Sequence, residues 1–219
     1  MTPETSSIGD TNIGETKLIA GELCLDFANT ADWHAGDSPQ ERLRSYEDLV
    51  FWGVRAGILG DASARRLLRE AKKHPSRARA VLKRAVALRE SVYRIFVAVV
   101  EARPPNVSDL QTVNSALSAA LRHLRVTNVG DQYAWEWVDR DRALDCMLWP
   151  VLRSTADVLT SQKRAMVGQC ADDRGCGWLF LDSSKNRSRR WCMMADCGNR
   201  AKALRHYRRT RGTGLTKTR

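Results

Sequence analysis

Four cysteines near the end of the 219-residue chain are the residues best suited to chemistry. They are Cys170, Cys176, Cys192 and Cys197, two close pairs separated by 15 residues. Thiolate is a preferred ligand of structural zinc, and four thiolates leave no coordination position open for water. The spacing therefore predicts one structural zinc ion with no catalytic role. The alternatives are four unrelated cysteines, or an iron–sulfur cluster, which the long insert between the pairs disfavours.

The net charge of the chain is concentrated around these cysteines. Residues 163–219 hold 15 Lys and Arg against 4 Asp and Glu, and this difference equals the whole formal charge of +11. Such a concentration is typical of a surface that binds a polyanion, and the alternative is a solvated basic helix that binds nothing specific. We expect eight cations to contact DNA: Lys185, Arg187, Arg189, Arg190, Lys202, Arg205, Arg208 and Arg209. Arg200 follows Cys197 closely, so it could contact either DNA or the metal site.

The segment around the cysteines is small and needs its metal. A module of about 45 residues buries too little apolar surface to fold unaided, and zinc binding can supply the missing stability. Strands are predicted at Trp178–Leu181 and Arg190–Cys192, followed by a basic helix from Cys197 to about Thr210. A knuckle, a hairpin and a helix in this order are the treble-clef arrangement.

The rest of the chain must position this module. Helices are expected over 49–58, 61–73, 76–101, 108–124 and 142–160, with capping-box patterns at 45–48 and 108–111. A β-hairpin is predicted at 125–138, and 21–29 is expected to be an apolar, strand-like element. The fold class is α+β: a mainly helical amino-terminal domain (16–162) with a small β-hairpin, plus a carboxy-terminal treble-clef zinc finger (163–211). Short tails, 1–15 and 212–219, complete the chain.

The helical domain offers weaker candidates. Five residues could line a ligand pocket: Asp26, Asn29, Arg89, Arg94 and Trp135. The alternatives are core packing for the aromatic residue and an internal carboxylate partner for a buried arginine. Cys24 and Cys146 stand alone in apolar stretches and are expected to be buried thiols. The sequence holds no nucleotide-binding loop or persuasive acid–base constellation, so an enzyme is not expected.

Two stretches resemble known families. Cys197-Gly198-Asn199-Arg200, placed after a Trp-Leu-Phe-Leu strand and Arg-Trp-Cys, resembles the CGNR-type zinc finger. Residues 21–30 (GELCLDFANT), Trp33 and 41–49 resemble the ABATE domain, although His34 stands where that family more often has Arg. Together the resemblances cover about residues 18–211. They imply a bacterial stress-induced transcription regulator, with a treble-clef finger for DNA and a ligand pocket in the amino-terminal domain.

These observations predict a DNA-binding transcriptional regulator that holds one zinc ion and has no catalytic activity. A small-molecule effector is a further expected partner, and a homodimer is plausible because one finger alone would bind DNA weakly. The alternative is a zinc-stapled adaptor that binds RNA or an acidic protein. An enzyme working in the amino-terminal pocket would need a bound metabolite to be considered. Neither a membrane span nor a signal peptide is expected, and we predict a cytoplasmic location.

Overall fold

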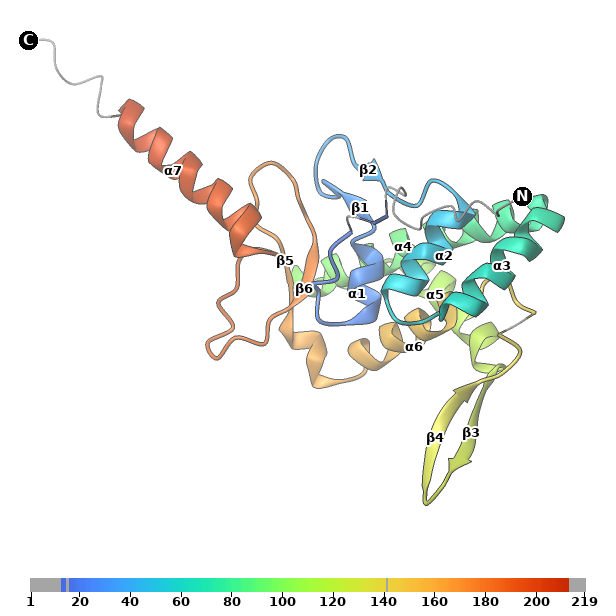
Figure 1. Cartoon of the computed structure of the whole chain (residues 1–219). Helices are drawn as coiled ribbons and strands as arrows, with labels where there is room; N and C mark the ends of the chain where they lie inside the picture. The colour runs from blue at the N-terminus through green and yellow to red at the C-terminus, as the bar shows by residue number, and fades with distance from the viewer. Residues whose placement is uncertain (1–12, 15, 141, 213–219) are drawn as a thin grey trace, which may run out of the picture.

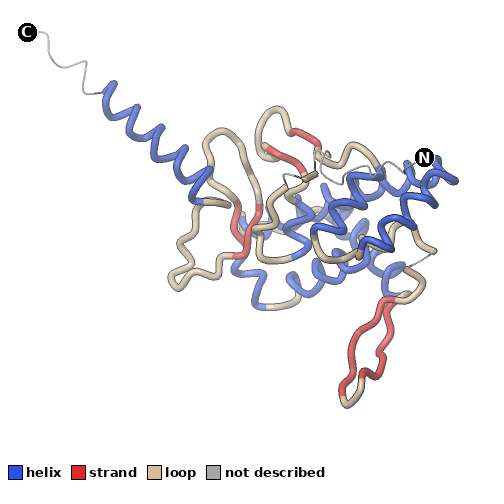
Figure 2. Tube along the Cα trace, in the orientation of Figure 1, coloured by secondary structure: helices blue, strands red, loops and turns tan. Residues whose placement is uncertain are grey.

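A computed structural model of the chain describes residues 13–14, 16–140 and 142–212 (Figure 1). Within these residues the protein is mostly helical, with three small two-stranded antiparallel sheets (Figure 2). The carboxy-terminal part combines the four cysteines with one of these sheets and a helix. This confirms the predicted α+β fold class. The tails expected at 1–15 and 212–219 lie almost entirely outside the described residues.

The order of elements is simple, with helices first and the cysteine-bearing part last. The helices are α1 (Leu23–Ala28), α2 (Tyr46–Arg55), α3 (Asp61–Lys73), α4 (Pro75–Val100), α5 (Val107–Leu121), α6 (Leu148–Leu159) and α7 (Asn199–Gly212). The strand pairs are β1 (Ala31–Asp32) with β2 (Gln40–Glu41), β3 (Leu124–Val129) with β4 (Gln132–Trp137), and β5 (Val167–Gln169) with β6 (Leu179–Leu181). A 3-10 turn, η1 (Gln162–Met166), precedes β5, and a π-helical turn, η2 (Met194–Gly198), precedes α7. No helix in the described part of the chain is long and apolar enough to cross a membrane.

The helical core forms around α4, which packs against α1, α2, α3 and α5. An apolar stripe along α4 is buried, and it includes Val81, Ala85, Leu88, Val92 and Ile95. Pro75 occupies the first turn, where a missing backbone N–H removes no helical hydrogen bond. Helix α1 packs against both α4 and α6. Helix α6, the last α-helix before the finger, therefore belongs to the same core.

The capping box predicted ahead of the second helix is present. The Ser45 side chain accepts a hydrogen bond from the Asp48 backbone N–H, and the Asp48 carboxylate accepts one from the Ser45 backbone N–H. This reciprocal pair satisfies two N–H groups that the helix cannot bond internally. Helix α3 ends at Lys73, as the His74-Pro75 break predicts.

Several predictions of secondary structure were wrong. The capping box expected at 108–111 is absent, because α5 begins at Val107 and the Asn106 side chain caps it by accepting from the Ser108 N–H at 3.0 Å. The helix expected over 142–160 begins at Leu148. Residues 23–28, expected to be strand-like, form helix α1, because Cys24, Phe27 and Ala28 are spaced to share one buried helical face. In the finger, β6 pairs with β5 and not with 190–192. The connection between β5 and β6 contains the first cysteine pair, and a 2.8 Å backbone hydrogen bond from the Cys170 N–H to the Trp178 carbonyl continues the β5–β6 pairing into this connection. Residues 190–192 are linked to it by a backbone hydrogen bond from Ala171 to Arg190, 2.9 Å long.

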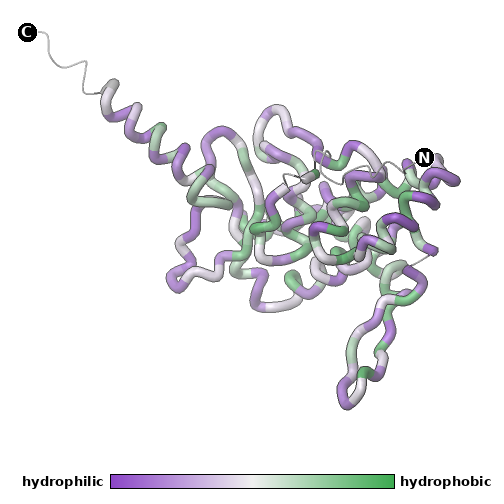
Figure 3. The backbone as a smooth tube through the Cα atoms, viewed as in Figure 1, coloured by the Kyte–Doolittle hydropathy of each residue, from purple (hydrophilic) through white to green (hydrophobic). Residues whose placement is uncertain are grey.

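The finger is attached to the helical domain through β6 and continues into a projecting helix. Leu179 of β6 is fully buried in the main core, and β6 packs against α1. Helix α7 extends away from the body of the molecule (Figure 1) and is mostly hydrophilic along its length (Figure 3). The β3–β4 hairpin projects at the other end of the molecule (Figure 1).

Candidate metal centre and nucleic-acid interface

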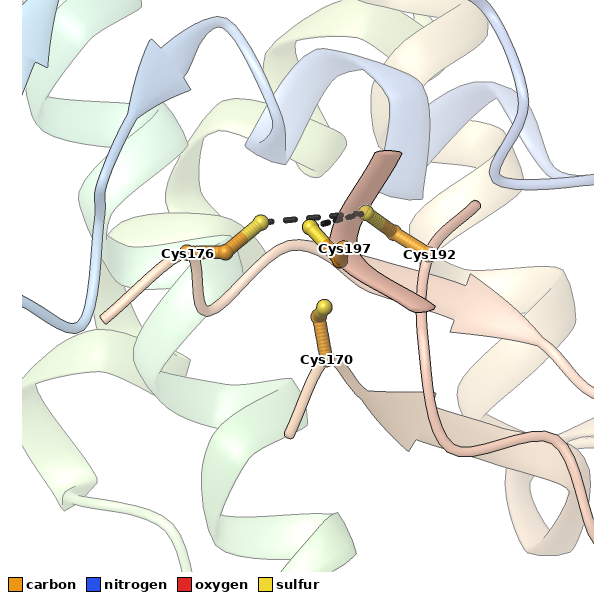
Figure 4. A group of neighbouring side chains, drawn as sticks. All are labelled: Cys170, Cys176, Cys192 and Cys197. Atoms are coloured by element: carbon orange, nitrogen blue, oxygen red, sulfur yellow. Dashed lines mark hydrogen bonds between the residues drawn. The ribbon is translucent and has the colours of Figure 1, made fainter. Parts of the chain in front are cut away.

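The structure brings the four predicted ligands together. Their sulfur atoms all lie within 4.8 Å of one another, and each residue is at most 7% exposed. Cys170 follows β5, and Cys176 lies in the loop before β6. Cys192 follows the segment 182–191, which we call the basic loop, and Cys197 lies in the turn η2. Their side chains point toward a common centre (Figure 4).

The geometry fits a tetrahedral zinc ion. The Sγ–Sγ distance is 3.7 Å between Cys176 and Cys192, and 3.5 Å between Cys192 and Cys197. Zinc–sulfur bonds of about 2.3 Å in a tetrahedron separate the sulfur atoms by about 3.8 Å. The donor set therefore matches one zinc ion held by four thiolates.

The electrostatics of the four sulfurs also call for a cation. Hydrogen bonds from Cys176 and Cys192 lower the pKa of Cys170, whereas contacts with Cys170 and Cys176 raise the pKa of Cys192. Burial raises the pKa of Cys197 as well. Sulfurs packed this closely cannot all be ionised unless positive charge lies among them, and a divalent zinc ion supplies that charge.

Two glycines allow the turn around Cys176 to press against the helical domain. Gly175 and Gly177 have φ angles of 85° and 66°, in the left-handed region that favours glycine. A Cβ atom on Gly177 would lie 2.5 Å from the Cβ of Ala35, and one on Gly175 would lie 2.5 Å from the Cα of Gly36. The backbone of 34–35 donates hydrogen bonds to the carbonyls of Cys176 and Gly175 at 3.0 and 3.1 Å.

Arg200 supports the metal site directly. Its guanidinium donates a hydrogen bond to Cys197 Sγ at 2.8 Å and two to the carboxylate of Asp172, at 2.6 and 3.0 Å. Asp172 is 8% exposed, so its charge needs this partner. The sequence left open whether Arg200 contacts DNA or the metal site, and in the structure its guanidinium contacts the metal site. Sequence reasoning missed Asp172, although an acid two residues after the first ligand could have signalled a partner for the arginine.

The helical domain holds the finger by several buried hydrogen bonds. The Asn29 side-chain amide donates to the Leu179 carbonyl and accepts from the Leu179 N–H, both at 2.8 Å. Trp178 Nε1 donates to the carbonyl of Ala31 at 2.9 Å. Tyr93 Oη, on α4, donates to the Gly177 carbonyl at 3.1 Å. These contacts join the finger to α1, β1 and α4.

Arg189 is placed differently from the other predicted DNA-contacting cations. Its guanidinium donates hydrogen bonds to the carbonyls of Ile19, Leu181, Trp191 and Cys192 and lies 4.3 Å from the Phe180 ring centre. A guanidinium used in this way has few donors left for phosphate. The assignment of Arg189 to DNA is therefore corrected: this residue fixes the basic loop between β6 and Cys192.

The remaining predicted cations are exposed, on the basic loop and on α7. They are Lys185, Arg187, Arg190, Lys202, Arg205, Arg208 and Arg209. Trp191 connects the two groups, since its ring centre lies 5.4 Å from the Arg190 guanidinium and 6.0 Å from that of Arg205. Arg208 also lies 3.7 Å from the exposed carboxylate of Asp173. The basic loop and the basic helix thus meet at one aromatic side chain.

The two arginines of the predicted pocket have internal partners. Arg89, 3% exposed, forms two hydrogen bonds with the Glu41 carboxylate at 2.5 and 2.7 Å and another with Glu90 at 2.7 Å. Arg94 pairs with Asp109 on α5 at 2.5 Å. An internal carboxylate was the predicted alternative to an acidic ligand, and the structure supplies one in both cases.

The other three residues of the predicted pocket lie in separate surroundings. Asn29 contacts the finger, as described above. Asp26 accepts a hydrogen bond from the Ala20 N–H at 2.9 Å, and its burial raises the pKa of its carboxyl to about 6. Trp135 is on the projecting hairpin and is 58% exposed, with its ring 4.8 Å from the Arg153 guanidinium. The five residues do not form one pocket, and this prediction is corrected.

A cavity that the sequence did not indicate lies between the helical domain and the finger. Its volume is about 200 Å³, and it is lined from the helical side by Trp33 and Arg42 and from the finger by Arg200, Trp178 and three of the cysteines. Trp33 lies 5.1 and 5.2 Å from the guanidinium groups of Arg174 and Arg200. Both parts of the molecule therefore contribute walls to the same cavity.

A mainly helical domain joined to a four-cysteine zinc finger defines the class of protein. The chain belongs to the ABATE family, described as "Putative stress-induced transcription regulator", which matches residues 21–162. Residues 166–210 match the CGNR zinc finger, so Cys170, Cys176, Cys192 and Cys197 form its single zinc site. Comparison with curated proteins gives no match.

Proposed function

We propose that this protein is a non-catalytic transcriptional regulator whose zinc finger binds DNA through α7 and the basic loop. The observation that carries the proposal is the location of charge. The whole formal charge of +11 lies in residues 163–219, and Lys202, Arg205 and Arg209 are exposed on a helix that projects from the body. Long cationic side chains on such a helix can reach phosphates and base edges in a groove of DNA. We propose a cytoplasmic location for a protein with this role.

The zinc ion has a structural part in this function. It joins η2, at the base of α7, to the β5–β6 hairpin, and the hairpin is anchored in the helical domain. When zinc is bound it offsets two of the four negative charges of the thiolates and fixes the direction of the helix. We also propose the limits of the two domains: 16–162 for the helical domain and 163–211 for the finger.

The cavity between the two parts gives an effector a place to act. A small molecule there would touch Trp33 and Arg42 of the helical domain and Arg200 of the finger at the same time. The affinity for the effector would then differ between two positions of the finger relative to the helical domain. Such a difference in affinity is what a ligand needs in order to shift the finger from one position to the other. We propose this cavity as the effector site, in place of the pocket predicted from the sequence.

Fluorescence anisotropy with labelled duplex DNA tests the proposal. The variant Lys202→Glu with Arg205→Glu should lose most of its affinity, and the log–log salt slope should fall in magnitude by about two, since each phosphate contact contributes about 0.9. The matched control, Arg79→Glu with Lys83→Glu, reverses two exposed charges on α4 and should bind like wild type. Circular dichroism and zinc content establish that each variant is folded.

The same assay separates the second candidate, a zinc-stapled adaptor for RNA or an acidic protein. Equal affinity for duplex DNA, RNA and heparin at the same salt concentration would favour the adaptor. Unchanged DNA affinity in the α7 variant would contradict the proposed interface.

A further inference from the structure

The β3–β4 hairpin has one apolar face and one polar face. In the antiparallel register, Val126 pairs with Trp135, Asn128 with Tyr133, and Leu124 with Trp137, so these six side chains share one face. The other face carries the Arg125–Glu136 ion pair at 2.8 Å and the pairs Thr127–Ala134 and Val129–Gln132. We call the first of these the aromatic face.

Most of the aromatic face is open to solvent. Tyr133 is 77% exposed, Trp135 58% and Val126 57%. A two-stranded hairpin is marginally stable in water unless its apolar face is covered. Exposed apolar area of this kind marks an interaction surface in a folded protein.

The aromatic face continues into an apolar groove on the helical domain. Trp137, at the base of the hairpin, lies 5.9 Å from Trp149, centre to centre, and Trp149 stacks on His123 at 4.1 Å. Trp149 and His123 both line a groove of about 430 Å³ between α4, α5 and α6. The groove is lined mainly by small or apolar residues, among them Leu88, Ala116, Ala119, Ala120, Leu148 and Leu152.

We propose that the aromatic face and this groove are the self-association surface of the protein, and that its occupant is a second copy of the chain. The hairpin of each copy lies along the groove of the other, related by a two-fold axis. One patch then serves both subunits, as an isologous interface requires. The groove receives Tyr133 and Trp135 of the partner, which are the large anchors typical of interface centres.

The available area agrees with this occupant. The exposed apolar area available to a partner is roughly 450 Å² per copy. This figure follows from the exposed fractions of Tyr133, Trp135, Val126 and Leu121, with about 150–250 Å² for a fully buried aromatic residue. Two hairpins covering equal areas of two grooves bury roughly 1,800 Å² in total, within the range of stable protein–protein interfaces.

The distribution of charge also favours a second copy. The helical domain (16–162), which carries the aromatic face, holds 21 Lys and Arg against 18 Asp and Glu, so its net charge of +3 repels a second copy far less than the +11 of residues 163–219 would. The positive finger lies at the other end of the molecule (Figure 1). Association through the hairpin therefore leaves both fingers exposed.

Sedimentation velocity of the full zinc-loaded chain, from 1 to 100 µM, tests the proposal. Wild type should sediment as a dimer. Tyr133→Thr with Trp135→Thr should raise the dimer dissociation constant by about 30-fold or more, the effect of losing at least one anchor residue. The control, Gln132→Thr with Ala134→Thr, places the same residues on the polar face of the same strand and should stay dimeric.

A second measurement locates the contact in an otherwise intact chain. Trp135→benzoylphenylalanine, mixed with an isotope-labelled wild-type copy and irradiated, should cross-link to residues of α5 or α6 in that copy. If wild type stays monomeric at 100 µM, the proposal is overturned, and the aromatic face would then bind a different protein. A dimer that persists in the Tyr133/Trp135 variant, or cross-links confined to α7, would overturn it equally.

Discussion

The Asn29 side chain forms two hydrogen bonds of 2.8 Å with the backbone of Leu179, one as donor and one as acceptor. The two residues are separated by 150 positions, and both are fully buried. Strand β5 pairs with one edge of β6, and on the other edge the Asn29 side chain supplies the hydrogen bonds that a neighbouring strand would otherwise form with Leu179. The zinc finger and the helical domain are therefore joined through the core, and their stabilities should be coupled.

Replacing Asn29 by Ala should destabilise the whole chain. The N–H and carbonyl of Leu179 would both be left buried without a partner, at a cost of about 2–4 kcal/mol. Urea unfolding of the zinc-loaded protein measures this. Asn186→Ala, at an exposed position of the basic loop, is the control and should change stability by less than about 0.5 kcal/mol. Equal effects of the two substitutions would contradict the role of Asn29.

Zinc content should be one ion per chain and should depend on the four clustered cysteines alone. Cys192→Ser should remove the zinc measured by elemental analysis and lower the melting temperature, because β6 would lose its support on the finger side. Cys24→Ala and Cys146→Ala should retain one zinc. Burial raises the pKa of these two thiols to about 12 and about 11, so both should react slowly with alkylating reagents at neutral pH.

Arg200→Gln should weaken zinc binding without removing a ligand. The substitution deletes the hydrogen bond to Cys197 Sγ and leaves Asp172 buried without its cation. Loss of such a supporting contact typically lowers metal affinity by about 10–100-fold. Competition with a chromophoric chelator measures the change, and Lys202→Gln on the same helix should bind zinc like wild type. If Arg200→Gln changed DNA affinity alone, Arg200 would be a DNA contact.

Asp26→Asn should change how stability depends on pH. Burial raises the pKa of the folded-state carboxyl from 3.8 to about 6, so between these values the folded chain holds the proton more strongly than the unfolded chain. The free energy of unfolding contributed by Asp26 is therefore full below pH 3.8 and is lost as pH rises through 6. Relative to wild type, Asp26→Asn should gain stability as pH rises from 4 to 7, by at most about 3 kcal/mol. Urea unfolding across this range measures the difference, and a difference independent of pH would contradict it.

Much of this protein could be predicted from local sequence. The type and spacing of Cys170, Cys176, Cys192 and Cys197 indicate their ligand, because thiolates in close pairs are chemically suited to zinc in almost any fold. The positive charge of 163–219 is a sum over side chains and needs no coordinates. Helices such as α3 and α4 also follow from local signals, since a helix bonds only to itself and its caps lie within a few residues.

The tertiary structure decided what the polar side chains contact. Arg189 and Lys202 are both basic residues of the finger, yet Arg189 donates to three carbonyls of the finger and to the Ile19 carbonyl of the helical domain, whereas Lys202 is exposed. Strand β6 pairs with β5 and forms hydrogen bonds with Asn29, which is 150 residues away in the sequence, so local sequence cannot specify these partners. Local sequence specifies which donors and acceptors exist, but packing of the whole chain determines which of them meet, because each buried group must find its partner in space.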